Sequence, residues 1–160
     1  MSYSWTKPGS RKRIPYENPR SRRVNVLAAY SPDGPQPALT WGLQRGSLVS
    51  GQLVDFVQRI PRLPDKPLVV VLDNGSLHVS WVVKEALAKL REQRIYLYYL
   101  PPYSPELNEI EPIFGGIKAH DLPARSYADW ESLEAAITAG FTQAEERLHQ
   151  RCDSQPGKAA

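Results

Sequence analysis

The stretch LVVVLDNGSLHVSWVVKEALAKLREQRIYLYYL, residues Leu68–Leu100, decides the fold of this chain. Its five consecutive apolar residues at Leu68–Leu72 are typical of a strand that is buried on both faces of a parallel sheet. Apolar residues then recur at helical spacing from about Leu77 to Arg91, and Ile95–Leu100 reads as a second strand. Strand, helix and strand at this length predict a βαβ unit with parallel strands.

The flanking sequence extends this unit to an α/β domain. Val24–Tyr30 and Ala38–Leu43 read as strands joined by a turn-rich loop, which predicts a hairpin. A helix capped by Ser50 is expected to follow the hairpin. Ser104 is expected to start another helix, with proline at the first helical position, and Tyr127–Arg147 holds one or two more.

Length and composition indicate one globular domain. The chain has 160 residues, of which 41% are hydrophobic and 23% charged, both ordinary for a soluble protein. No apolar run approaches the roughly 20 residues that a membrane-spanning helix needs. Its single cysteine, Cys152, cannot form an intrachain disulfide. We expect a domain over residues 1–150 and a disordered tail over residues 151–160.

The net charge of +3 is unevenly distributed, because the first 23 residues are strongly basic. Such a stretch favours a phosphate-rich partner, although a solvated loop is the alternative interpretation. The candidate contacts to a nucleic-acid backbone are Arg11, Lys12, Arg13, Arg20, Arg22 and Arg23.

Carboxylates are expected at the carboxyl ends of both parallel strands, where functional groups of open α/β sheets gather. Asp73 directly follows the first strand, and Glu106, Glu109 and Glu111 follow the second. Mg²⁺ prefers one or two carboxylates together with water and phosphate oxygens. The pattern therefore indicates a metal site for phosphoryl transfer, and a simple turn or helix cap at Asp73 is the alternative.

Four quoted segments carry a family resemblance. They are Asp-Asn-x-x-x-His at Asp73–His78, LPPYSPELNEIE at Leu100–Glu111, SWTKPG at Ser4–Gly9 and RVNVLAAY at Arg23–Tyr30. Together they resemble the DDE transposases of the mariner-like and related bacterial insertion-sequence superfamily. The resemblance covers most of the chain, and YSPELN-x-IE is its most specific part.

The resemblance implies an RNase H-like fold, in which a mixed sheet is flanked by helices. It implies cleavage of transposon ends and their transfer to target DNA, with Mg²⁺ or Mn²⁺ held by three acidic residues. Asp73 matches the second acid and Glu111 the third. Asn74, His78 and Asn108 match supporting positions, and Asn74 could orient the Asp73 carboxylate. Double-stranded DNA is the implied partner, in the cytoplasm of a bacterium and at its nucleoid, with no membrane involved.

The chain departs from the family at its start, because the strand that carries the first acid lies upstream of the SWTKPG segment in relatives. That strand is central in the fold, so its absence is expected to leave two open sheet edges. We therefore expect a homodimer, or complementation by an upstream-encoded transposase half. Two other interpretations stay open: a catalytically dead fragment that binds DNA or transposase as an inhibitor, and an RNase H-like nuclease unrelated to transposition.

Overall fold

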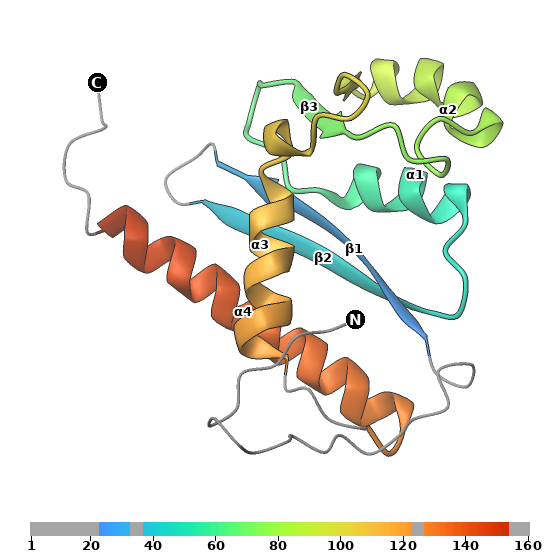
Figure 1. The fold of residues 1–160 in the computed structure, drawn as a ribbon. Helices are drawn as coiled ribbons and strands as arrows, with labels where there is room; N and C mark the ends of the chain where they lie inside the picture. Colours follow the sequence, from blue (N-terminus) through green and yellow to red (C-terminus); the bar gives the residue numbers. More distant parts are fainter. Residues whose placement is uncertain (1–22, 33–36, 123–126, 154–160) are drawn as a thin grey trace, which may run out of the picture.

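A computed structural model describes residues 23–32, 37–122 and 127–153 of the chain. Its strands lie in the first part of this region and its last elements are helical, as Figure 1 shows. In chain order they are β1 Val24–Ser31, β2 Ala38–Arg45, α1 Ser50–Arg59, β3 Leu68–Leu72, α2 Trp81–Glu92, β4 Ile95–Tyr99, a 3₁₀ turn η1 Pro105–Leu107, α3 Ile110–Gly116, a π-helical turn η2 Ile117–Asp121 and α4 Trp130–Asp153.

The strand pairings agree with the sequence-based prediction. β1 and β2 form an antiparallel hairpin, in which Val24 pairs with Arg45 and Ser31 with Ala38. β3 and β4 run parallel, in register from Leu68 opposite Ile95 onward, and α2 connects them. The mixed α/β arrangement is that of an RNase H-like fold, as expected.

The strands form two separate sheets, and within the described residues no strand joins β1 to β3. β1 pairs only with β2, and β3 pairs only with β4. All eight residues of β1 keep partial solvent exposure, although apolar clusters pack on both of its faces. We attribute this exposure to the open edge of β1, which is what the expected absence of a central strand would produce.

Helix α1 connects the two sheets through a shared apolar core. Phe56 and Val57 of α1 are buried in the same cluster as Val70 of β3, and Leu27 and Ala29 of β1 pack against that cluster. Burial of this kind stabilises by roughly 25 cal/mol per Å² of apolar surface. One face of β1 and one face of β3 are thus held on the same helix even though the strands are not paired.

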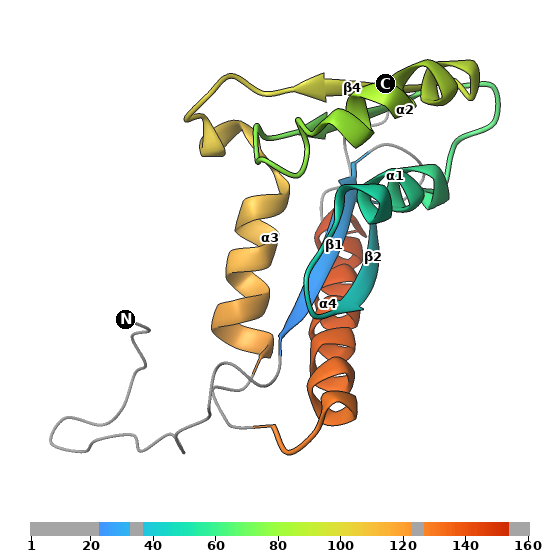
Figure 2. The same ribbon diagram turned by 90° about the vertical axis from the view of Figure 1, so that its right-hand side faces the viewer.

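The opposite face of the hairpin carries a second core, formed with the C-terminal helices. Leu39 of β2 is buried there with Ile117 of η2 and with Ile137 and Phe141 of α4. Even-numbered residues of β1 face this cluster, as the two-residue period of a strand requires. Helices α3 and α4 lie along the hairpin in both views (Figures 1 and 2).

Several local predictions were wrong. Val49, not Ser50, is the N-cap of α1, because the Gln52 side-chain oxygen accepts a hydrogen bond from the Val49 N–H at 2.9 Å. Helix α2 begins at Trp81, later than expected, with Ser80 as its cap. The single helix α4 extends to Asp153, into the segment expected to be a disordered tail, whose remainder lies outside the described residues.

The prediction that β3 is buried on both faces was also wrong. Val69 and Val71 are 56% and 49% exposed, and Tyr96 and Tyr98, their partners on β4, are exposed as well. Only the α1 and α2 side of this sheet is covered by described elements. No helix in the described part of the chain is long and apolar enough to cross a membrane.

Candidate active site

Asp73 lies in the turn that directly follows β3. Its Oδ1 atom accepts a hydrogen bond from the Gly75 N–H at 2.9 Å, a short-range bond that aspartate makes readily in turns. A Cβ atom on Gly75 would come within 3.1 Å of that same oxygen. The turn therefore requires glycine at position 75 to hold the carboxylate where it is. The carboxylate remains about half exposed, at 51%.

His78 gives Asp73 a second polar contact. Its Nδ1 atom lies 2.6 Å from Asp73 Oδ1, and its backbone carbonyl accepts a hydrogen bond from the Tyr99 hydroxyl at 3.0 Å. Partial burial raises the pKa of Tyr99, so this hydroxyl stays protonated as a donor at neutral pH. Because Tyr99 is the last residue of β4, these contacts tie the Asp73 turn to the neighbouring strand.

Asn74 joins the carboxyl ends of the two parallel strands. Its side-chain amide donates to the Leu100 carbonyl at 2.5 Å, and the Leu100 N–H donates to the Leu72 carbonyl at 2.8 Å. The amide is thus directed at Leu100 and not at the Asp73 carboxylate, which the sequence suggested it could orient. It therefore fixes the loop after β4 beside the loop after β3.

Glu111 lies in the first turn of α3, where a negative charge interacts favourably with the helix dipole. Its side chain is exposed. Phe114, one turn further on, meets the ring of Phe141 edge to face at a centroid distance of 5.7 Å. This aromatic contact is one of the contacts that hold the helix of Glu111, because Ile110 and Ile113 of α3 pack against the same core.

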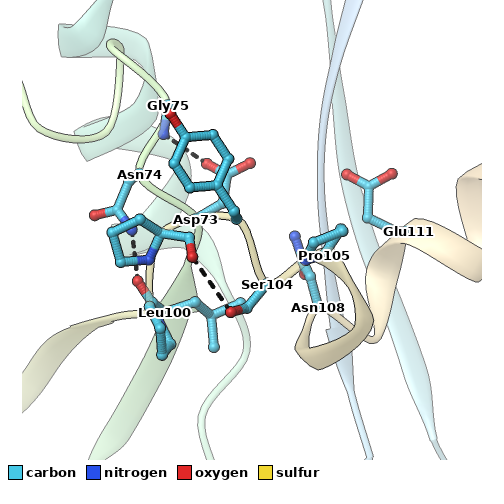
Figure 3. Close-up of a pocket in the computed structure, with 11 residues that line it drawn as sticks. Asp73, Asn74, Gly75, Leu100, Ser104, Pro105, Asn108 and Glu111 are labelled. Carbon is cyan, nitrogen blue, oxygen red and sulfur yellow. Dashed lines mark hydrogen bonds between the residues drawn. The ribbon is translucent and has the colours of Figure 1, made fainter.

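Asp73 and Glu111 line one cavity of about 430 Å³ at the carboxyl ends of β3 and β4. Figure 3 shows them on opposite sides of the space, with Ser104, Pro105 and Asn108 between them. The parallel register of β3 and β4 accounts for this, since both loops leave the sheet at the same edge. The structure therefore brings together the two acids that the sequence singled out, whereas Glu106 and Glu109 do not line the cavity.

The donor atoms of this cavity fit a hard divalent cation in part. Two carboxylates are a suitable protein contribution for Mg²⁺, which keeps several waters and accepts phosphate oxygens. One oxygen of Asp73 is engaged by Gly75 and His78. Among residues 23–32, 37–122 and 127–153, no group of three or more His, Cys, Asp or Glu side chains could hold a metal ion. A complete three-acid site would need a donor from outside these residues.

The other predicted site residues have mixed outcomes. Asn108, which matches a supporting position of the family, lines the cavity, and the N-cap of α3 is its neighbour Glu109, which makes no side-chain cap bond. Ser104 precedes only the 3₁₀ turn η1. Of the six basic residues predicted to contact DNA, Arg23 is described and exposed. The remaining five lie outside the described residues: Arg11, Lys12, Arg13, Arg20 and Arg22.

Sequence reasoning missed Tyr103 as a cavity residue. Its side chain is fully exposed, and its φ of 59° lies in the left-handed region that non-glycine residues seldom adopt. Strained backbone of this kind concentrates at functional sites. The signal available in the sequence was the run of prolines around Tyr103, which indicates a constrained turn but not its handedness.

Comparison with known proteins gives a match to one family. The model of the DDE superfamily endonucleases matches residues 1–134, which is most of the chain and includes both Asp73 and Glu111. A search of the curated proteins found no match.

Proposed function

The chain belongs to the DDE superfamily endonucleases, and from this premise we propose that it is the catalytic part of a DNA transposase. Its reaction would be the metal-dependent cleavage of DNA strands at transposon ends and their transfer to target DNA. The observation that supports this proposal most directly is the cavity lined by both Asp73 and Glu111.

In this proposal Asp73 and Glu111 hold Mg²⁺ or Mn²⁺. Such an ion would lower the pKa of a nucleophilic water and neutralise charge that develops on the phosphate. The chain's own residues supply the positioning. Gly75 and His78 orient the Asp73 carboxylate, Asn74 fixes the two strand-end loops against each other, and Phe114 anchors the helix of Glu111.

We further propose that the slot between β1 and β3 receives one strand. Each strand presents a row of backbone N–H and C=O groups without a ladder partner in the described residues, and α1 already holds both strands on one core. An added strand would satisfy those groups by β-augmentation. It would be an upstream segment equivalent to the one that precedes the SWTKPG segment in relatives, and it would bring a third acid.

Hydrogen exchange tests the strand proposal. On mixing with the upstream segment, amides of β1 and β3 that point into the slot should gain protection, because they acquire hydrogen-bond partners. Amides of β2 and α4 serve as internal controls and should not change. Protection that rises equally in β2, or not at all in β1 and β3, would contradict the proposed insertion.

Metal binding tests the carboxylate pair without requiring activity. The chain should bind Mn²⁺ weakly, as followed by loss of the free-ion electron paramagnetic resonance signal. Asp73→Asn and Glu111→Gln should each weaken this binding severalfold, because each removes a charged oxygen donor. Glu109→Gln is the matched control, since Glu109 is an exposed glutamate close to Glu111 that does not line the cavity.

Two outcomes would count against the proposed function. Glu109→Gln weakening Mn²⁺ binding as much as Glu111→Gln would show that the cavity is not the site. Equal binding by the wild type and Asp73→Asn would lead to the same conclusion. The chain alone is expected not to nick terminal-repeat DNA, and Mg²⁺-dependent nicking that Asp73→Asn abolishes would refute the need for an upstream segment.

A second candidate function is inhibition of intact transposase by binding without cutting. It is favoured by one observation, namely that the described residues supply two acids and no third for the cavity. Adding the chain to an active transposase should then reduce strand transfer, and Asp73→Asn should reduce it equally. If the chain binds no DNA even at low salt and leaves the transposase unaffected, this candidate fails.

A further inference from the structure

A basic surface lies at the end of the β3–β4 sheet opposite the cavity. It comprises the end of α1, the loop before β3, the end of α2 and the turn before β4, which gather at one side of the molecule in Figure 2. We call the six exposed cations of this surface the basic end: Arg59, Arg62, Lys66, Lys89, Arg91 and Arg94.

Side-chain hydrogen bonds hold the two halves of the basic end together. Arg62 donates to the Gln93 carbonyl at 2.9 Å, and Arg94 donates to the Asp65 carbonyl at 2.9 Å. Asp65 and Arg94 both have φ of 59°, the left-handed conformation that is uncommon for residues other than glycine. These two turns aim the Asp65 carbonyl and the Arg94 guanidinium at each other.

The charge of the basic end is not neutralised. Segments 58–66 and 89–94 hold six basic side chains against two acidic ones, Asp65 and Glu92, a larger surplus than the +3 of the whole chain. Arg59, Arg62 and Arg94 bond to backbone carbonyls, which carry no net charge. In the described part of the chain, none of the six forms an ion pair with a carboxylate.

We infer that the basic end is a second DNA-binding surface, which contacts the phosphate backbone of duplex DNA. Guanidinium groups held by neutral acceptors keep their full charge and spare N–H donors for phosphate oxygens. β3 is five residues long, so the basic end lies about 16 Å from the cavity edge at about 3.3 Å per residue. That distance corresponds to about five nucleotides at about 3.4 Å each.

This inference rests on the proposed function for one point, the choice of duplex DNA as the polyanion, since a transposase acts on duplex DNA. The contacts predicted here are to phosphates, so they would add affinity and salt dependence without reading sequence. The six cations of the basic end are also different residues from the contacts predicted at positions 11–23.

Binding of a 30-base-pair duplex in EDTA, followed by fluorescence anisotropy between 50 and 200 mM KCl, tests this inference. Each phosphate interaction that a substitution removes should reduce the magnitude of the slope of log K against log salt concentration by about 0.9. At 0.1 M salt this corresponds to roughly eightfold weaker binding. The double variant Arg62→Gln/Arg94→Gln should therefore bind about 60-fold more weakly, with a slope smaller by about 1.8.

Two further variants separate charge from folding. Lys66→Gln/Lys89→Gln should give a similar loss, and among the described residues neither side chain makes a hydrogen bond that the change would break. Arg62→Lys/Arg94→Lys keeps both charges and should retain most of the slope. The matched control is Lys84→Gln/Lys118→Gln, which removes the same net charge from exposed positions on α2 and η2 that form no ion pair among the described residues, and it should leave the slope unchanged.

The inference is overturned if the wild type does not bind duplex DNA at 50 mM KCl, or if the control pair lowers binding as much as the basic-end pairs. If the basic-end variants lose binding to vesicles of anionic lipid but keep the wild-type affinity for DNA, the surface binds a membrane and the inference is also overturned. EDTA keeps the test independent of the cavity, so failed Mn²⁺ binding would refute the proposed function and leave this inference standing.

Discussion

Replacing Phe141 by alanine is expected to destabilise the protein and to loosen the helix that carries Glu111. Phe141 is 2% exposed and is the largest fully buried side chain among the described residues. Its ring stacks on Trp41 at a centroid distance of 5.5 Å and meets Phe114 edge to face. The substitution therefore removes core volume and the partner that fixes α3 at the same time.

The magnitude follows from these contacts. Truncation of a buried phenylalanine to alanine costs about 3–5 kcal/mol. Two aromatic pairs, each contributing about 0.5–1.5 kcal/mol beyond area burial, place Phe141 in the upper half of that range. A domain of this size is stable by about 5–15 kcal/mol, so the alanine variant is expected to be marginal. Phe141→Leu keeps apolar contact but loses both aromatic pairs, so it should lose about 1–3 kcal/mol and stay folded.

Urea unfolding gives the free energy of unfolding, and Mn²⁺ affinity reports on the placement of Glu111. Phe56 provides the matched control, since it is 5% exposed but belongs to the other core, around α1. Phe56→Leu is also expected to lose stability, although less than Phe141→Leu, because Phe56 takes part in neither aromatic pair. Of the two variants, only Phe141→Leu should weaken Mn²⁺ binding, because Phe141 contacts Phe114 and Phe56 belongs to the other core.

Two results would refute this reasoning. A loss below about 2 kcal/mol for Phe141→Ala would show that the second core is not packed as described. Equal weakening of Mn²⁺ binding by the two leucine variants would show that Glu111 responds to general stability and not to its aromatic anchor.

Two other predictions concern α4 and its neighbours. A hydrogen bond from Arg45 lowers the pKa of Glu134 in the folded protein. The ionised carboxyl therefore stabilises the fold fully at pH values above its unfolded pKa of about 4.3. This contribution disappears as the pH falls through the lower pKa of the folded state. Urea unfolding at pH 6 and pH 3.5 should therefore show a smaller acid-side loss in Glu134→Gln than in the wild type. Gly140→Ala should lower the melting temperature, because the added Cβ would lie 3.2 Å from Ile117 Cγ2. Overpacking of this kind costs about 1–3 kcal/mol, whereas the gain in helix propensity from glycine to alanine is about 1 kcal/mol. Gly115→Ala has open space around its Cβ and should raise the melting temperature; the opposite ranking would contradict the described packing.

The sequence predicted the parts of the fold that depend on local periodicity and on strand order. The βαβ unit follows from the apolar run at β3, the helical spacing of α2 and the second run at β4. Because parallel strands end at the same edge, the sequence also predicted that Asp73 and Glu111 would lie near each other.

Other features depend on which surfaces are covered, and an apolar run does not reveal that. Val69 and Val71 have the hydrophobicity of a doubly buried strand, but no described element covers their face of the sheet. The caps depend on single hydrogen bonds, so Gln52 at α1 and Glu109 at α3 could not be distinguished from neighbouring candidates. The left-handed backbone at Tyr103 is another feature that the residue type does not predict.

Within the described residues β1 and β3 have no common partner strand, so the strand proposed to fill that slot would link the stability of the protein to its own concentration. A segment that binds only the folded form adds RT ln(1 + [L]/Kd) to the free energy of unfolding, about 4 kcal/mol at a thousandfold excess over Kd. In a cell, the proposed strand donor would therefore set how much of this chain survives proteolysis. The abundance of the folded chain would then follow the supply of that strand.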